Sequence, residues 1–407
     1  MRRREALALA LALAATPALA QLPPSVTLDE VLRLAERSPR VTAAEREADA
    51  ARADRDAAGA LPNPSLTFGH SRPSGPHTMF DGSSQEQATV ELPVPVFGQR
   101  GARMRAADLQ VGRADSQRRL TGVESKRQAA LAYLRLLAAQ EQLAARNAAA
   151  AEVERIRGVV VGRLESGMAS RYDQARADAE LSLARLAAQR AESDVSEQQA
   201  ALAAALGALA WQPRAAGSLA EVQRSLERGE AQALADASPA ARLARDESAA
   251  AQGRVDLAER ERFPVPSIAV GRSWTNSPFG AANYIGLTSE VPIFDTRRAQ
   301  ADRARAEAAS ARERERAVNA TLQADYQRHR DTLRQRRAAL ARLDQDVPAL
   351  QGSFLEMAES AYRLGKGSLF ELLDARRTQA EAAVARLELV GAIIESELEL
   401  RALAGEL

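Results

Sequence analysis

The stretch "LPNPSLTFG" (residues 61–69) interrupts a chain that otherwise has the composition of long helices. Around it the sequence is rich in Ala, Arg and Glu, which favour helix. Here two prolines frame an alternating run of polar and apolar residues, a pattern typical of the start of a β-strand. The same pattern returns about two hundred residues later as "FPVPSIAVG" (residues 263–271). We therefore expect two equivalent strand starts in a mainly helical protein.

The two halves of the chain share further segments in the same order and near the same offset. Self-similarity of this kind indicates a tandem duplication in which each half is one structural unit. The expected fold class is mainly α with a small β part, in a duplicated order of helix, strand, strand, long helix, turn and long helix. In each matched Ser-Pro pair, the serine is expected to cap a helix that has proline at its first position. The matched segments are Ser38-Pro39 with Ser238-Pro239, "LPVPVFGQR" (92–100) with "VPIFDTRR" (291–298), and "RLESGMASRYDQAR" (163–176) with "RLGKGSLFELLDAR" (363–376).

The first residues have the pattern of a cleaved signal peptide. Arginines occupy positions 2–4, residues 6–15 contain only Ala and Leu, and Ala18-Leu19-Ala20 forms a small-residue cleavage site. We therefore expect residues 1–20 to be removed on export. The other expected divisions are repeat 1 at 21–210, an inter-repeat linker at 211–235 and repeat 2 at 236–407.

The expected strands and long helices have unusual lengths. Each strand has about the 9–11 residues that a tilted strand needs to cross a bilayer. The helix expected at 99–162 would be on the order of 90 Å long at ~1.5 Å per residue, which is too long for a globular domain. The strands are expected at about 64–72, 86–94, 266–275 and 282–291, and the long helices at about 99–162, 168–209, 296–362 and 368–404.

The composition excludes several classes of protein. The 55 basic and 54 acidic residues nearly balance, so no net charge recruits nucleic acid. There is no cysteine, which excludes disulfides and leaves no residue for lipid attachment after the signal peptide. No later stretch reaches the ~18 apolar residues of a membrane helix, and no nucleophile elbow, P-loop or zinc-protease motif indicates an enzyme. The mature chain is therefore expected either to stay outside the membrane or to enter it as β-strands.

Four strands of bilayer length cannot close into a barrel on their own. An open sheet edge would leave backbone polar groups unpaired in lipid, and the smallest outer-membrane barrels have about eight strands. Several chains must therefore share one barrel: two copies would supply about eight strands and three would supply about twelve, and the physical argument leaves both open. Prolines mark the changes between helix and strand. They are Pro62, Pro64, Pro264 and Pro266 before the strands, and Pro93, Pro95 and Pro292 after them.

The duplicated layout, the segments "LPNPSLTF" and "ELPVPVFGQR", and the turns "RLESG" and "RLGKGSLFELLDA" together resemble the TolC-like outer membrane factors of tripartite efflux systems. The resemblance covers essentially the whole mature chain, and the first two segments look most like the branch that serves cobalt-zinc-cadmium exporters. It implies a homotrimer with a twelve-strand outer-membrane β-barrel and a long periplasmic α-helical barrel. It also implies passive export of heavy-metal cations from an inner-membrane pump of the RND type through a periplasmic adaptor, with no cofactor.

The resemblance assigns the turns between the long helices to the adaptor. Arg363-Leu364-Gly365 is similar to the arginine-leucine-glycine turns of the family, and Arg163-Leu164 repeats the pattern in the first half. Gly167 and Gly367 are expected to supply the backbone freedom that such sharp turns need. The predicted adaptor contacts are therefore Arg163, Leu164, Arg363, Leu364 and Gly365.

Glu371 and Asp374 follow the second turn, at positions where relatives place a ring of carboxylates at the pore entrance. Three chains would repeat them around one axis, and such a ring favours cations. The competing interpretation is local, because Ser368-Leu369-Phe370-Glu371 has the pattern of a capping box and acidic residues are common at helix starts. The aligned positions of the first half are Arg171 and Gln174. We predict a gate at Asp374 and Glu371, carried by one helix pair of each protomer.

Three residues in or beside the first hairpin loop could bind metal. They are His70, His77 and Met79. Two histidines and a methionine in a surface loop rarely form a metal site, and a duct gains nothing from holding its cargo. No metal site is therefore predicted.

Residues that flank or lie within the strands have two interpretations of equal weight. Arg100 and Arg297-Arg298 either anchor the chain at the lipid interface or lie in a solvated helical turn. Trp274 and Tyr284 belong either to an aromatic belt at the membrane surface or to packing within the sheet.

The leading hypothesis is an outer-membrane exit duct with a large periplasmic part and no catalytic residues. Two alternatives stay open. One is the same duct serving multidrug or small-molecule export, and the other is a periplasmic coiled-coil scaffold or adaptor. The four bilayer-length strands argue against the scaffold, which would have no use for two matching hairpins.

Overall fold

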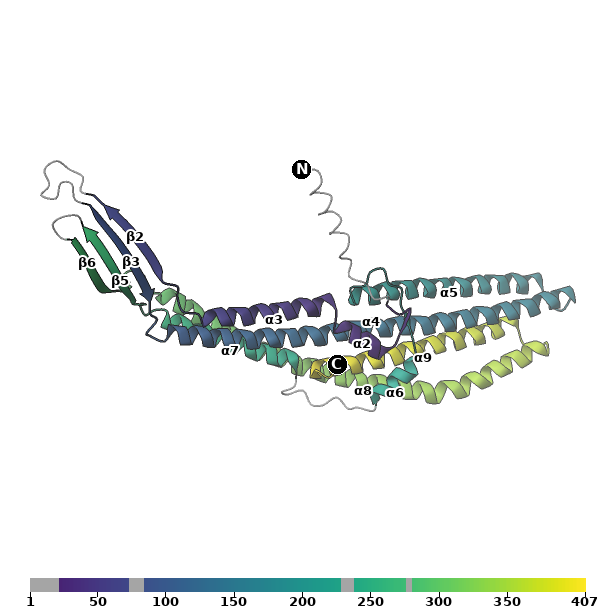
Figure 1. Ribbon diagram of the computed structural model, residues 1–407. Coiled ribbons are helices and arrows are strands. Elements are labelled where there is room, and N and C mark those ends of the chain that lie inside the picture. Colours follow the sequence, from purple (N-terminus) through teal and green to yellow (C-terminus); the bar gives the residue numbers. More distant parts are fainter. Residues whose placement is uncertain (1–21, 73–83, 228–237, 276–279) are drawn as a thin grey trace, which may run out of the picture. The chain divides into compact units, whose positions relative to one another are not determined.

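The structure is a computed structural model that describes residues 22–72, 84–227, 238–275 and 280–407 (Figure 1). The expected signal peptide at residues 1–20 lies outside the described residues. The elements are β1 (Ser25–Val26), α2 (Leu28–Ala35), α3 (Pro39–Ala58), β2 (Ser65–Ser71), β3 (Gln85–Pro93), α4 (Gln99–Glu165), α5 (Arg171–Ala205), β4 (Arg214–Ala215), α6 (Leu219–Glu227), α7 (Pro239–Arg260), β5 (Ser267–Thr275), β6 (Gly280–Thr288), α8 (Arg298–Arg363) and α9 (Leu369–Ala404).

The order of these elements confirms the expected fold class. Each half runs through helix, two strands, a long helix, a turn and a second long helix. Some ends differ from expectation by a few residues: β6 stops at Thr288, and α5 starts at Arg171 and stops at Ala205. The ends of α5 follow local turn chemistry, because Ser170 caps its start and the left-handed Gly207 follows its end. Among the described helices, none combines the length and the hydropathy of a membrane-spanning segment.

The described residues form two compact units, and each unit takes segments from both halves of the chain. The first, which we call the helix-hairpin unit, comprises the described parts of Met1–Val41, Gly122–Ala233 and Asp325–Leu407. The second, the strand unit, comprises the described parts of Thr42–Thr121 and Leu234–Ala324. The units therefore do not coincide with the two repeats expected from the sequence. The reason is that α4 and α8 each continue from one unit into the other, and equivalent segments of the two repeats pack together.

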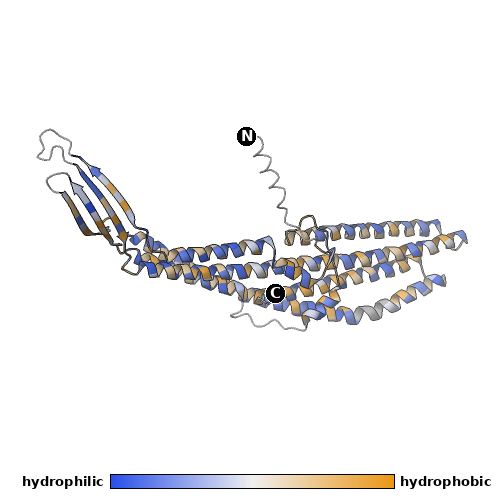
Figure 2. Ribbon diagram, viewed as in Figure 1, coloured by the Kyte–Doolittle hydropathy of each residue, from blue (hydrophilic) through white to orange (hydrophobic). Residues whose placement is uncertain are grey.

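The strand unit contains one antiparallel sheet in the order β2-β3-β5-β6. The hairpins of the two halves join through β3 and β5, where Val90 pairs with Val270. Hydrophobic and hydrophilic residues are interleaved along the strands (Figure 2), so one face of the sheet is apolar and the other is polar. β2 starts directly after Pro64 and β5 directly after Pro266, because proline has no backbone N–H to donate to a helix or to a ladder.

A residue with positive φ precedes each long helix that follows a hairpin. In the first half it is Gly98, at φ +81°, and in the second half it is Arg297, at φ +50°. Their carbonyls begin the helices by accepting from Ala102 N and Ala301 N. The left-handed region costs a residue with a side chain about 1–2 kcal/mol. Arg297 offsets part of this cost through its side chain, which donates from Nη1 to Glu261 O at 3.0 Å.

The two Ser-Pro pairs start helices with proline at the first position, but neither serine caps its helix through its side chain. Ser38 Oγ lies 2.9 Å from Ser125 Oγ instead, and the side chain of Ser238 makes no capping hydrogen bond. Both serines are buried. The prediction that these two serines cap their helices with their side chains is therefore wrong. In the first pair, the hydroxyl of Ser38 hydrogen-bonds to Ser125 of α4 instead of to the start of α3.

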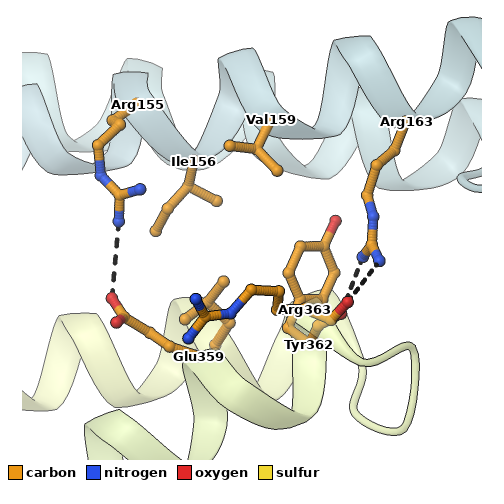
Figure 3. Close-up of a pocket in the computed structure, with 8 residues that line it drawn as sticks. Arg155, Ile156, Val159, Arg163, Glu359, Tyr362 and Arg363 are labelled. Atoms are coloured by element: carbon orange, nitrogen blue, oxygen red, sulfur yellow. Dashed lines mark hydrogen bonds and ion pairs between the residues drawn. The ribbon is translucent and has the colours of Figure 1, made fainter.

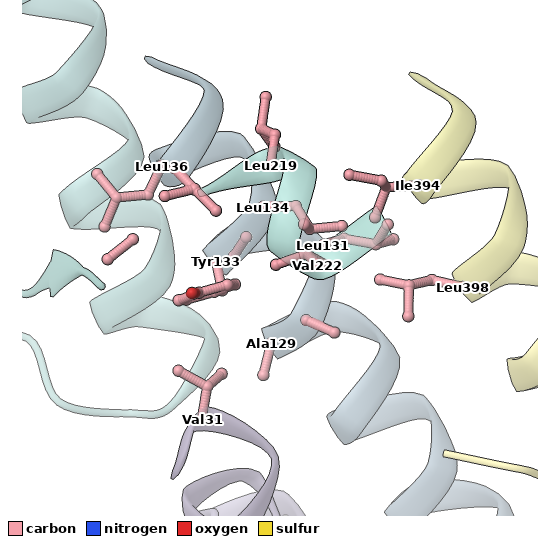
Figure 4. Packing of buried hydrophobic residues seen from close by; sticks show 14 of the residues in the cluster. Val31, Ala129, Leu131, Tyr133, Leu134, Leu136, Leu219, Val222, Ile394 and Leu398 are labelled. Carbon is pink, nitrogen blue, oxygen red and sulfur yellow. The ribbon is translucent and has the colours of Figure 1, made fainter. Parts of the chain in front are cut away.

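The helix-hairpin unit has a large apolar core that includes residues of α2, α4, α5, α6 and α9 (Figure 4). Its fully buried side chains include Tyr133 and Leu136 from the middle of α4. Val26 reaches this core because β1 pairs in parallel with β4, in a ladder too short to leave a sequence pattern. Trp211 Nε1 also donates to Pro23 O at 3.0 Å. These contacts fasten the start of the described chain to the segment between the repeats.

Tyr133 gives a test of this core. Its hydroxyl donates to Ala216 O, and burial is the main cause that raises its pKa to about 12. We expect Tyr133→Phe to lower the free energy of unfolding by about 1 kcal/mol, because the ring stays while the carbonyl loses its donor. Urea denaturation of the purified variant measures this, and equal midpoints for the two proteins would contradict it.

Candidate functional site at the helix-hairpin tips

The turns that join α4 to α5 and α8 to α9 share one geometry, and we call them the first tip and the second tip. The left-handed residue is Gly167 in the first tip (φ +75°) and Gly365 in the second (φ +70°). The N–H that follows each glycine donates to a carbonyl five residues back, Arg163 O at 2.7 Å and Ala361 O at 2.8 Å. Each helix thus ends in a Schellman motif, whose left-handed position favours glycine.

Three residues after each of these glycines, a serine starts the next helix. Ser170 forms a capping box with Asp173, and Ser368 forms one with Glu371, which confirms the box expected there. The structural offset between the tips is therefore 198 residues, two fewer than the match between the repeats indicates. Asp173 is thus the structural counterpart of Glu371.

Gly367 is required by packing and not by its backbone angles. The left-handed residue of the second tip is Gly365, so the expectation that Gly367 supplies this freedom is wrong. A Cβ on Gly367 would lie 2.8 Å from Ala361 Cβ, too close for two carbon atoms. The difference arises because glycine at 365 ends α8, whereas the aligned Glu165 continues α4.

Arg163 of the first tip binds the second tip. Its guanidinium donates to Tyr362 O (2.9 Å) and to Arg363 O (3.3 Å), and lies 4.6 Å from the centre of the Tyr362 ring (Figure 3). These carbonyls belong to the last turn of α8, where the helix dipole favours a cation. Arg163 is therefore half-buried in a contact within the chain. The other predicted adaptor contacts are the half-buried Leu164 and the exposed Arg363, Leu364 and Gly365.

Next to the tips, four charged side chains from three helices form an ion-pair network that the sequence did not reveal. Arg376 of α9 lies 2.6 Å from Glu152 of α4 and pairs closely with Glu359 of α8. Arg155 of α4 contacts the same two carboxylates, Glu152 at 2.6 Å and Glu359 at 3.6 Å. Figure 3 shows the contact with Glu359. Only the i,i+3 spacing of Glu152 and Arg155 is visible in the sequence. The other pairs join residues that are far apart in the chain.

A hollow of about 300 Å³ lies beside the network, between α4, α8 and α9. Arg155, Arg163 and Glu359 are among the charged residues that line it, and Ile156 and Leu372 are among the apolar ones (Figure 3). A second hollow of about 610 Å³ lies between α4, α5 and α9, and both alanines and charged residues line it. Both hollows are open grooves between helices.

The network makes the tips sensitive to acid. It holds the pKa of Glu152 below the ordinary value of 4.5, first through hydrogen bonds from Arg155 and then through the charge of Arg376. Because the folded state lowers this pKa, the stabilisation is complete above about pH 4.5 and is lost as the pH falls through the folded-state pKa.

We therefore expect the second tip to loosen when the pH falls from about 6 to well below about 4.5, through the lowered pKa of Glu152. The chain has no cysteine, so Leu364→Cys gives a single site for a spin label. Its electron paramagnetic resonance spectrum should show increased mobility on acidification. In a Glu152→Gln background the label should be more mobile already at pH 6. A label whose mobility does not change with pH would contradict the prediction.

Glu371 and Asp374, the predicted gate residues, are both exposed on the first turns of α9. Glu371 has a local partner, since its Oε2 accepts from Ser368 N at 3.0 Å. Asp374 lies one turn further along the helix, outside the cap. Of the two, Asp374 is thus the carboxylate that is not committed to holding the helix start.

The structural offset changes the first-half counterparts of the gate residues. The repeat alignment pairs them with Arg171 and Gln174, whereas the tips pair them with Asp173 and Arg176. The guanidinium of Arg176 lies 4.6 Å from the centre of the Phe370 ring in the second tip. A cation therefore stands in the first half where the second half has its second gate residue. The counterpart of Glu371, however, is the carboxylate Asp173, so the restriction of the gate to one helix pair per protomer stays a prediction.

Arg100 and Arg297, which follow the hairpins, each close the end of a helix from their own half. Arg100 Nε donates to Gly59 O at 2.8 Å, just after α3. Arg297 Nη1 makes the equivalent bond to Glu261 O at the end of α7. Capping of neighbouring helices is a role that neither sequence interpretation included.

The strand aromatics lie on opposite faces of the sheet. A Cβ on Gly271 would lie 2.4 Å from the ring of Tyr284, whose hydroxyl also lies 2.6 Å from Gln87 Nε2. Tyr284 thus packs within the sheet. Trp274 lies on the apolar face, where the guanidinium of Arg272 is 5.6 Å from its ring centre.

The hairpin histidine that the structure describes has an acidic neighbour. His70 Nδ1 lies 3.8 Å from Glu86 Oε1 across the β2–β3 pair. His77 and Met79 lie outside the described residues. Within the described part of the chain, no group of three or more His, Cys, Asp or Glu side chains is placed to hold a metal ion.

Two curated bacterial proteins that are named for metal resistance are similar to this chain. It is 30% identical to the nickel-cobalt-cadmium resistance protein NccC of Alcaligenes xylosoxydans xylosoxydans over 242 residues, which are 57% of this chain and 53% of NccC. This alignment thus spans about half the length of NccC. This chain is also 24% identical to the cobalt-zinc-cadmium resistance protein CzcC of Cupriavidus metallidurans over 381 residues, which are 90% of this chain and 87% of CzcC.

Comparison with solved structures and with a family profile agrees with the observed fold. The crystal structure of CusC, described as a protein that folds into a transmembrane channel, has a TM-score of 0.78 at 17% identity and covers 95% of both chains. The sequence profile of the outer membrane efflux proteins matches residues 32–208 and 231–406, once in each half. Since the profile matches most of the sequence, this chain belongs to the outer membrane efflux protein family.

Proposed function

We propose that three copies of this chain form the outer-membrane exit duct of a tripartite efflux system for heavy-metal cations. In this proposal the four strands of each copy contribute to one twelve-strand barrel, and the long helices form a helical barrel in the periplasm. A periplasmic adaptor and an inner-membrane pump of the RND type deliver the substrate, which the duct conducts passively and without a cofactor. The signal peptide at residues 1–20 directs export and is then removed.

The open, two-faced sheet is the observation that carries this proposal. β2 and β6 are its edge strands, and each is paired on one side only among the described strands. The apolar face exposes large side chains such as Leu66 (75%) and Ile285 (78%). An apolar face of this kind favours lipid, and unpaired edges in lipid require further strands. Additional copies of the same two hairpins would meet both requirements.

The relatives support heavy-metal cations as the substrate. NccC and CzcC are named for resistance to nickel, cobalt, zinc and cadmium, and both align with this chain. A carboxylate such as Asp374 at a narrow entrance would favour cations over anions. Small-molecule export by the same duct remains the alternative outcome of the experiment below.

Two measurements test the assembly and the substrate separately. Native mass spectrometry in detergent should show three chains. A monomer as the sole species would contradict the shared barrel, and a dimer would contradict the twelve-strand trimer. In a host that lacks its own ducts but expresses the matching pump and adaptor, the chain should restore resistance to cobalt, zinc or cadmium. Restored resistance to drugs but not to these metals would replace cations with small molecules as the substrate.

The proposed gate has a direct electrical test. Repeated around a threefold axis, Asp374 would form a ring of like charges that attracts multivalent cations. We expect Asp374→Asn to fold normally, because the capping box uses Ser368 and Glu371. In planar bilayers the variant should lose its cation selectivity and its block by trivalent cations added from the periplasmic side. If both properties persist, Asp374 lies on a solvated helix face and does not line the pore.

A further inference from the structure

The apolar face of the sheet changes its chemistry along the strands. Every large apolar side chain that the described strands expose lies on this face. Successive rows on one face are ~7 Å apart, so the four rows span a substantial part of a bilayer leaflet. From the helix end to the loop end they are Leu92, Ile268 and Leu287; then Leu66, Val90, Val270 and Ile285; then Phe68, Ala88, Arg272 and Asn283; then His70, Glu86, Trp274 and Ala281.

Arg272 stands where the apolar rows end. The register places Ala88 and Asn283 beside it on the neighbouring strands, and neither carries a charge. The one carboxylate of this face within the described strands, Glu86, lies 3.8 Å from His70. The exposed guanidinium of Arg272 instead lies 5.6 Å from the ring centre of Trp274. The loop end of the apolar face thus presents a cation on an aromatic ring, next to rows that are fully apolar.

We infer that Arg272 and Trp274 bind the anionic, phosphate-bearing head groups of outer-leaflet lipids, and so set the depth at which the sheet crosses the membrane. This inference rests on the proposed insertion of the sheet into the outer membrane. The two apolar rows would contact acyl chains, and a guanidinium in that layer would be costly. One row further, it can donate in parallel to two phosphate oxygens, while tryptophan favours the interface between acyl chains and head groups.

A lipid is the occupant that this arrangement fits, in preference to a free phosphate ion. A single exposed arginine on an open face would hold a small anion weakly. A lipid phosphate, in contrast, is held at the right depth by its own acyl chains packing on the rows of Leu66 and Ile268. The guanidinium of Arg272 therefore binds a phosphate that the acyl chains of the lipid already hold at the depth of Arg272.

Fluorescence quenching tests the depth. The chain has two tryptophans, so Trp211→Phe leaves Trp274 as the only reporter in the full-length protein. In phosphatidylcholine vesicles with added phosphatidylglycerol, Trp274 should be quenched more strongly by lipids spin-labelled near the head group than by lipids labelled at the chain end. A companion variant, Trp211→Phe with Trp274→Phe and Leu66→Trp, moves the reporter two rows toward the helices and should show the opposite order.

The two reporters separate failure of this inference from failure of the proposed function. If the tryptophan at 66 is quenched by the deep label but Trp274 is quenched by neither label, or more strongly by the deep one, the head-group contact is wrong and membrane insertion stands. If neither reporter is quenched by any lipid label, the sheet does not face lipid, and both proposals fail.

A second measurement tests the head-group chemistry. Head-labelled phosphatidylglycerol should quench Trp274 about fivefold more effectively than head-labelled phosphatidylcholine, the enrichment expected for one arginine at an anionic surface. Arg272→Gln should abolish the preference, Arg272→Lys should keep most of it, and Arg46→Gln on α3 serves as the control for loss of one arginine. A preference that survives Arg272→Gln would overturn the inference. The inference would also be overturned if ~10 mM inorganic phosphate removed the preference more effectively than chloride of equal ionic strength, because the site would then hold a free anion.

Discussion

A tryptophan at position 365 is expected to abolish export while the trimer still assembles in the outer membrane. Gly365 is exposed in the second tip, and a Cβ there would meet no atom within 4 Å. The new ring would therefore extend into the space that the proposed adaptor occupies, without clashing inside the protomer. The backbone cost is about 1 kcal/mol, because φ is +70°, which is too small to unfold a large oligomer.

Metal accumulation in cells and cross-linking to the adaptor measure this effect. Gly365→Ala is the matched control: it has the same backbone cost but adds only a methyl group, so export should be kept. Gly167→Trp carries the same change to the first tip, where a Cβ also meets no neighbour, and it shows whether both tips take part in docking. Normal export and normal cross-linking in Gly365→Trp would rule out docking at the second tip.

Arg376→Ala should loosen the second tip more than any other single charge removal in the network. Arg376 is only 19% exposed and partners both Glu152 and Glu359. Its loss leaves two part-buried carboxylates facing each other with Arg155 alone to balance them. Breaking a fully buried pair costs about 3–5 kcal/mol and a surface pair less than about 1 kcal/mol, so we expect about 2 kcal/mol here.

Hydrogen exchange around residues 359–376 measures this loss and should accelerate by about thirtyfold, the equivalent of 2 kcal/mol. The neighbouring Arg377 is the control. It is exposed and forms its ion pair with Glu381 on the same helix, so Arg377→Ala should change exchange by about twofold at most. Equal exchange rates in the Arg376 and Arg377 variants would show that the network does not hold the tip.

The sequence by itself determined the features that depend on neighbours in the chain. Prolines at 64 and 266 mark the starts of two strands, because proline has no N–H to donate and disfavours the helical conformation in the residue before it. The box of Ser368 and Glu371 was visible because both partners lie within one turn. The duplication determined the fold class, because it shows that every element is present twice.

Only the tertiary structure decided which of two nearby glycines makes the second turn, and what the charged residues bind. Gly365 and Gly367 are both possible left-handed residues in the sequence. The structure uses Gly365 for the turn and Gly367 for a close approach to Ala361. Arg163 was predicted to contact the adaptor, yet its partners are carbonyls at the end of α8, in the second tip. The physical reason is common to these cases: local patterns specify backbone geometry, whereas the partner of a long charged side chain depends on segments that only folding brings together.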